Sequence, residues 1–261
     1  MLTDVKKWVN NQLSQRGLRI EYVGKADSLV GTPRRSLAES YSLLAKLNLA
    51  PKTVIDVGAA FGTPDLHNAF PNAELVLFEP VAEFEPSLNK ILETRRGVLV
   101  GSAAGKTAGT LTFYVHTNQL EGSSAYQETQ GEYADGEQRT VQVVRVDETV
   151  NELGLAGPYI LKIDVQGGEL DVLAGCSAIL DQVVAISLEV SLFQFMSGAP
   201  QCVEVVDHLA KLGFVPWDVI PGWTRPLDQA LGQLDIVFVP ENGPLRENHS
   251  FATQAQYDKL H

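Results

Sequence analysis

The chain has 261 residues, of which 44% are hydrophobic and 20% charged, and its formal net charge is −12 at pH 7. This composition is typical of a soluble globular protein. The acidic balance argues against a protein that grips nucleic-acid phosphates non-specifically, so we expect no nucleic-acid partner. The two cysteines form no C-x-x-C motif, which argues against a disulfide scaffold or a zinc site. No uncharged apolar stretch approaches the length of about 18 residues that a membrane span needs. No signal-peptide pattern is visible either, so we expect a cytoplasmic protein without a membrane partner.

Apolar runs and amphipathic segments alternate along most of the chain. The apolar runs predict strands at 53–57, 73–78, 98–104, 159–165, 183–190, 214–220 and 234–239. The amphipathic segments predict helices at 4–16, 35–47, 64–70, 82–94, 147–153, 168–180 and 201–212. Such alternation predicts an α/β fold, with a mostly parallel sheet covered by helices on both faces.

The segment 109–146 has a different pattern. The runs GTLTFYVH and RTVQVVRV alternate with a period of two and flank the polar stretch TNQLEGSSAYQETQGEYADGEQ. This predicts an antiparallel pair around a long loop, inserted into the α/β order. The expected organisation is a helical extension over 1–50, a main domain over 51–240 that contains the insertion, and a C-terminal tail over 241–261.

The first strand ends in DVGAAFGTP, a stretch that could open a nucleotide pocket. Asp56 ends the strand, and Gly58 and Gly62 occupy the turn, where glycine allows positive φ and close approach of a ligand. Thr63 can cap the following helix, and Pro64 fits its first turn. Taken alone, the stretch is equally well explained as a tight turn without a ligand.

Glu79, at the end of the second strand, favours the pocket. It follows Gly58 by 79 − 58 = 21 residues, the spacing at which an acidic side chain can bind ribose hydroxyls. A pyrophosphate cofactor such as NAD prefers G-x-G-x-x-G, whereas this loop reads D-x-G-x-x-x-G. A carboxylate facing the cofactor suits the sulfonium and ammonium groups of S-adenosylmethionine, so we favour that cofactor over NAD.

A second informative stretch is YILKIDVQGGELDVLAGC. Lys162 and Asp164 differ by two positions in a strand pattern, so they face the same side of the sheet. Charged pairs inside apolar strands are rare unless they are paired or functional. In SLEV of the next strand, Glu189 lies at a comparable edge, which predicts a carboxylate-lined cleft.

Together these segments resemble the FkbM-type S-adenosylmethionine-dependent methyltransferases. The resemblance covers about residues 50–240 and is carried by TVIDVGAAFGT, LFEP, GSS, VVRVDE, LKIDVQGGELDVLAG and SLEV, in the family's order. It implies a class I methyltransferase (Rossmann-like) fold with a seven-stranded sheet. Ala60 stands where the family often has Asn, which removes a polar side chain from the first loop, and Gly168 stands where Ala is common.

The resemblance also implies roles for individual residues. The glycine loop would line the methionine end of the cofactor, Glu79 would bind the ribose, and Ser123 and Ser124 would lie over the pocket. The expected cofactor-binding residues are Asp56, Gly58, Ala59, Gly62, Glu79, Ser102, Ser124, Asp164 and Gln166. Asp164, Gln166 and Glu189 would face the reacting centre.

The implied reaction is O-methylation of a hydroxyl on a small molecule, such as a sugar or another natural product. An alcohol needs a base or a metal to lower its pKa. The candidate bases are Asp164, then Glu189, then His116. Asp164 and Glu189 could also hold Mg²⁺ through their oxygens. Two alternatives stay open, an NAD-dependent Rossmann oxidoreductase and a non-catalytic S-adenosylmethionine-binding module. The oligomeric state is open too, with a homodimer among the options.

Aromatic side chains in the long loop and near the last strands could stack on the acceptor. The candidates are Tyr126, Tyr133, Trp217 and Trp223.

Overall fold

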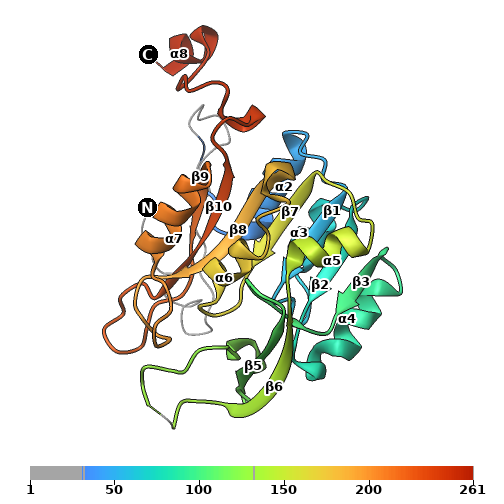
Figure 1. Ribbon diagram of the computed structural model, residues 1–261. Coiled ribbons are helices and arrows are strands. Elements are labelled where there is room, and N and C mark those ends of the chain that lie inside the picture. The colour runs from blue at the N-terminus through green and yellow to red at the C-terminus, as the bar shows by residue number, and fades with distance from the viewer. Residues whose placement is uncertain (1–30, 32, 132, 261) are drawn as a thin grey trace, which may run out of the picture. The chain divides into compact units, whose positions relative to one another are not determined.

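The computed structural model describes residues 31, 33–131 and 133–260 (Figure 1). The chain divides into two compact units, one spanning 34–249 and the other made of the residues before 34 together with 250–261. In the second unit the structure describes the helix α8 (Gln254–Leu260). The helix expected at 4–16 lies outside the described residues.

The larger unit is built on a seven-stranded sheet, as the sequence predicts, with strand order β3-β2-β1-β7-β8-β10-β9. Its strands are β1 (Thr53–Val57), β2 (Glu74–Phe78), β3 (Gly97–Val100), β7 (Tyr159–Ile163), β8 (Val183–Ser191), β9 (Phe214–Pro221) and β10 (Gln233–Pro240). Only β10 runs antiparallel to its neighbours, β8 and β9. β1 lies between β2 and β7, so the strand order reverses at its carboxyl end, which is where ligands bind in sheets of this kind.

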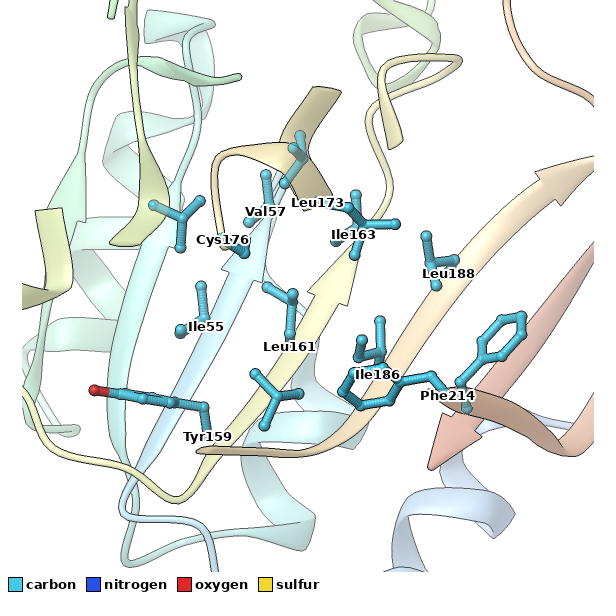
Figure 2. Close-up of a cluster of buried hydrophobic side chains, with 14 of the residues drawn as sticks. Ile55, Val57, Tyr159, Leu161, Ile163, Leu173, Cys176, Ile186, Leu188 and Phe214 are labelled. Atoms are coloured by element: carbon cyan, nitrogen blue, oxygen red, sulfur yellow. The ribbon is translucent and has the colours of Figure 1, made fainter. Parts of the chain in front are cut away.

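Helices cover both faces of the sheet (Figure 1). One face packs against α5 (Val146–Glu152), α6 (Glu169–Ala174) and α7 (Cys202–Lys211). The other face packs against α2 (Leu37–Lys46), α3 (Pro64–Ala69) and α4 (Glu85–Leu92). Alternate residues of the strands point to opposite faces of the sheet, so each face has its own hydrophobic core. Figure 2 shows the core on the α5, α6 and α7 side, where Ile55, Leu161 and Ile186 of adjacent strands lie side by side.

The inserted segment forms the expected antiparallel pair, which belongs to a second sheet of three strands. β5 (Gly109–Val115) and β6 (Glu137–Val144) pair antiparallel (Figure 1). β4 (Ala103–Ala104) pairs with β6 on its other side. The single strand predicted at 98–104 is therefore wrong. The chain turns where the Ser102 amide bonds the Val100 carbonyl at 2.8 Å, and the two halves of the run enter different sheets.

Two local predictions at helix ends also need correction. The helix predicted at 168–180 ends at Ala174, because the chain turns at Gly175, whose added Cβ would lie 2.3 Å from the Gly105 carbonyl oxygen. Thr63 occupies the position before α3 but makes no side-chain capping bond, while Pro64 does begin that helix. Gly175 thus lies against the backbone near β4, and glycine after a helical run is itself a stop signal in the sequence.

Candidate active site

A cavity of about 580 Å³ lies at the carboxyl ends of β1, β2, β7 and β8. Its floor is formed by the loops that follow these strands. The inserted sheet and the long loop supply another wall, through residues such as Leu111, Phe113, Ser123 and Tyr126. The position is the one expected for a ligand at the switch in strand order.

The glycine loop after β1 has a left-handed backbone at three positions. Gly58, Ala60 and Gly62 have φ values of 71°, 45° and 92°. A Cβ on Gly62 would lie 2.3 Å from the Ile91 side chain. The positive φ and this close packing both favour glycine at this position, and the loop alone does not identify a ligand. Ala60 adopts a conformation that Asn tolerates better than Ala, so the departure from the family's usual residue costs some strain.

Glu79 lies at the cavity wall, and both of its carboxylate oxygens accept hydrogen bonds from backbone amides. Oε2 accepts from the Ala60 amide and Oε1 from the Val81 amide, both at 2.9 Å. The side chain is buried, and this burial raises its pKa. Each oxygen keeps a second lone pair, so the fixed carboxylate can still accept hydrogen bonds from a ligand hydroxyl.

Asp56 lies beneath the cavity and does not line it. It is fully buried, with Oδ2 2.9 Å from His67 Nε2 and Oδ1 3.4 Å from Lys162 Nζ. Burial opposes its ionisation, but the Lys162 ammonium and the His67 ring hold its pKa below the usual value. In this position Asp56 supports Lys162, which also donates to the Gly58 carbonyl oxygen at 2.8 Å.

Asp164 and Glu189 line the cavity and are joined by one amide. Gln166 Nε2 lies 3.0 Å from Asp164 Oδ1 and 2.7 Å from Glu189 Oε2. Lys162 Nζ lies 3.5 Å from the other Asp164 oxygen. Burial, followed by the nearby Asp164 charge, raises the pKa of Glu189 to about 8. This places a carboxyl group that can hold or release a proton near neutral pH in the cavity wall.

Two residues at the site were not singled out from the sequence. Asp235 of β10 lines the cavity, and its Cα is paired with that of Glu189 across the two strands. Burial, and then the Asp164 charge, raise the pKa of Asp235 to about 6. The sequence does contain a signal for Asp235, because it is a charged residue inside the apolar run LDIVFV. His67 had no comparable signal, since only folding brings α3 over Asp56.

The sequence-predicted residues divide into two groups. The cavity is lined by Gly58, Ala59, Gly62, Glu79, Ser102, Ser123, Asp164 and Glu189. Asp56, His116, Ser124 and Gln166 lie outside its lining. Among the predicted aromatic side chains, Tyr126 lines the cavity, while Tyr133, Trp217 and Trp223 do not.

His116 is at the start of the long loop, where its amide donates to Ser123 Oγ at 3.0 Å.

Metal-binding groups were sought over residues 31, 33–131 and 133–260. These residues contain no cluster of three or more His, Cys, Asp or Glu side chains that could hold a metal ion. The magnesium site considered from Asp164 and Glu189 thus finds no support there. In the same residues, no helix has the length and apolar character required to cross a membrane.

The arrangement offers distinct chemistry at different parts of the cavity. Carboxylates from β7, β8 and β10 can attract cationic groups and accept protons. Glu79 can bind vicinal hydroxyls. Apolar side chains, including Phe78, Phe84 and Leu111, can pack against a flat ring.

Comparison with known proteins gives one family. The model described as "Methyltransferase FkbM domain" matches residues 56–216, more than half of the chain. Over 198 residues the chain is 28% identical to the AMB antimetabolite synthetase AmbE of Pseudomonas aeruginosa, a match that covers 62% of this chain and 9% of that protein. The chain therefore spans less than a tenth of that relative's length.

Solved structures with a similar arrangement are more distant. Magnesium protoporphyrin IX methyltransferase from Synechocystis PCC 6803, solved with bound SAM, is 13% identical, with a TM-score of 0.42 and coverage of 91% of this chain and 96% of that one. Fibrillarin from Aeropyrum pernix, solved with S-adenosyl-L-methionine, is 14% identical, with a TM-score of 0.42 and coverage of 81% and 86%. At these scores the likeness adds nothing to the fold described above.

Proposed function

The chain belongs to the FkbM-domain methyltransferase family, and from this premise we propose that it O-methylates a hydroxyl of a small molecule such as a sugar or natural product. Its fold is the class I methyltransferase fold, and in this proposal the methyl donor is S-adenosylmethionine. The NAD-dependent alternative gains no support from the family match. The antimetabolite synthetase among its relatives supports a natural-product acceptor.

The proposed cofactor pose follows the chemistry of the cavity. Glu79 accepts hydrogen bonds from the ribose hydroxyls, held in place by its two backbone donors. The apolar wall with Phe78 and Phe84 packs against the adenine ring, and the carboxylates near Asp164 face the cationic methionine end. Asp56 does not contact the cofactor in this scheme. It pairs with Lys162, which in turn donates to the Gly58 carbonyl oxygen of the glycine loop.

The observation that carries the proposed chemistry is the pair Asp164 and Glu189 in the cavity wall. In the transfer, the acceptor oxygen forms a bond to the methyl carbon while the carbon–sulfur bond breaks and its electron pair returns to sulfur. The hydroxyl proton passes to a carboxylate of the pair. Much of the rate comes from holding the oxygen in line with the methyl group. The raised pKa of Glu189, about 8, makes it a base of suitable strength.

Cofactor binding is tested first, by calorimetry with S-adenosylmethionine and with NAD. Binding of NAD with no binding of S-adenosylmethionine would contradict the family's cofactor here. Binding of S-adenosylmethionine without turnover on any acceptor would favour a non-catalytic binding module.

The acceptor is tested with a panel of sugars and natural products that carry hydroxyl groups. S-adenosylhomocysteine release measures turnover, and NMR of the product shows which atom carries the methyl group. Methylation at nitrogen or carbon would overturn O-methylation. With an active acceptor, Asp164→Asn is expected to lower kcat more than it weakens cofactor binding.

A further inference from the structure

Gln166 contacts the two carboxylates of the site and not the cavity itself. Its side-chain amide has two N–H donors, and both are used, one by Asp164 and one by Glu189. Gln166 is absent from the cavity lining, although both of its partners are in it. The residue is thus placed to act on the carboxylates and not on a ligand.

The backbone of Gln166 is held in an uncommon conformation. Its φ is 54°, in the left-handed region, which is unfavourable for a residue other than glycine. The fully buried Ser124 of the long loop donates from Oγ to the Gln166 carbonyl at 2.7 Å. On the other side of the turn, a Cβ on Gly167 would lie 2.8 Å from the Ala199 side chain. Contacts from two separate loops therefore maintain this turn.

We propose that Gln166 is a positioning residue for methyl transfer, because its amide holds Asp164 and Glu189 at one separation. Ser124 maintains the turn and so links the long loop to the same pair. The inference rests on the proposed function, in which this pair faces the reacting hydroxyl. Two neighbouring carboxylates repel when both are charged, and an amide that donates to each offsets that repulsion. Displacement of a reacting group by about 1 Å can cost about 100-fold in rate.

The effect on Glu189 can be measured without knowing the acceptor. Gln166 donates to the charged form of Glu189, and loss of that bond should raise the pKa of Glu189 further. The other charges near Glu189 are Lys162 on β7, Asp164 just after β7 and Asp235 on β10, and the Gln166 variants change none of these three residues. The measurement is a pH titration of the side-chain carboxyl by ¹³C NMR on the full chain labelled at Glu, with Glu189→Gln identifying the signal.

The variants are Gln166→Leu, which removes the amide, and Gln166→Asn, whose shorter amide cannot reach both carboxylates. Asn tolerates left-handed φ well, so the second variant keeps the turn. Gln229 provides the matched control, since it also has positive φ, 63°, but lies in an exposed loop. Gln229→Leu and Gln229→Asn carry the same changes away from the site.

We expect both Gln166 variants to move the Glu189 titration to higher pH, with S-adenosylmethionine affinity within about twofold of the original. Both Gln229 variants should leave the titration unchanged. With an active acceptor, the Gln166 variants should lower kcat by about 10- to 100-fold at little change in KM for the cofactor.

The proposal is overturned if the Glu189 titration is unchanged in the Gln166 variants, or if it shifts equally in the Gln229 variants. It is also overturned if the Gln166 variants change only KM and leave kcat as it was. Failure of both Gln166 variants to fold would overturn it too, since the residue would then be structural. If the original chain methylates no hydroxyl, the proposed function fails, whereas the titration still shows whether Gln166 controls the pair.

Discussion

Gly58 and Asp164 are in direct backbone contact. A Cβ atom on Gly58 would lie 1.9 Å from the Asp164 carbonyl oxygen, and the Asp164 amide bonds the Val57 carbonyl at 3.0 Å. The glycine loop after β1 and the carboxylate-bearing end of β7 are thus parts of one packed unit. The cavity-facing position of Asp164 depends on the absence of a side chain at residue 58.

Gly58→Ala is expected to lower the free energy of unfolding by about 3 kcal/mol or more. The cost has two sources, the left-handed backbone at residue 58 and the clash of the new Cβ with the Asp164 carbonyl oxygen. Gly154→Ala is the matched control, since Gly154 has φ 68°, close to the 71° of Gly58, but has no atom within 4 Å of an added Cβ. The control should lose only about 1 kcal/mol, the cost of the backbone strain. Urea unfolding of both variants measures the difference. Equal losses would mean that the contact with Asp164 is unimportant.

Sequence patterns with a local physical cause predicted most of the fold. The apolar runs at β1, β2 and β7 gave strand bounds within two residues of those observed, because a buried parallel strand must be apolar along its length. The run 98–104 failed because both of its halves are apolar, and the Gly101-Ser102 break between them does not show that they enter different sheets. The end of α6 was missed although Gly175, its C-cap, is a local stop signal.

The site was predictable to the extent that its residues break an apolar pattern. Lys162 and Asp164 stood out for this reason, and the expectation that they share a face is confirmed by their 3.5 Å ion pair. Spacing along the chain, in contrast, cannot tell whether a side chain at a strand end points into a cavity or beneath it. Asp56 was expected at the cofactor but lies buried under Lys162, and its partner His67 comes from a helix with no such signal.

Lys162→Met should be strongly destabilising, because it leaves the buried Asp56 carboxylate without its cation. Breaking one side of a buried pair costs about 3–5 kcal/mol. Lys106→Met is the control, since Lys106 also lines the cavity but its ion pair with Asp171 is exposed, with 66% of the Lys106 side chain accessible. That pair should contribute at most about 1 kcal/mol.

Thermal unfolding of the two Lys variants gives the comparison. Adding Asp56→Asn to Lys162→Met removes the uncompensated charge and should restore part of the loss. If the double variant is no more stable than Lys162→Met alone, the cost does not arise from Asp56.

Glu79→Ala should weaken S-adenosylmethionine binding by about 10- to 100-fold, since it removes the proposed ribose acceptor and leaves two backbone donors without a partner. Calorimetry measures the change. Glu74→Ala is the control, because Glu74 begins β2, the strand that Glu79 follows, at the end away from the cavity. Unchanged affinity in Glu79→Ala would show that Glu79 only supports the loop through the Ala60 and Val81 amides.

Glu189 should make the stability of the protein depend on pH. Its pKa is raised from 4.5 to about 8 in the folded state, so the unfolded chain loses its proton at lower pH than the folded one. The stabilisation is complete below about pH 4.5 and is lost as pH rises through about 8. Glu189→Gln lacks this titration, so its unfolding free energy relative to the original chain should rise by more than about 1 kcal/mol between pH 5 and pH 9.

Chemical unfolding at a series of pH values measures this difference, and the other titrating groups largely cancel because both proteins contain them. Glu121→Gln is the matched control, since Glu121 lines the same cavity but is exposed. The difference between Glu121→Gln and the original chain shows how far the loss of an exposed carboxylate alone changes stability over the same pH range. A constant difference for Glu189→Gln would mean that Glu189 is already ionised at neutral pH, and its proposed role as a base near pH 8 would then fail.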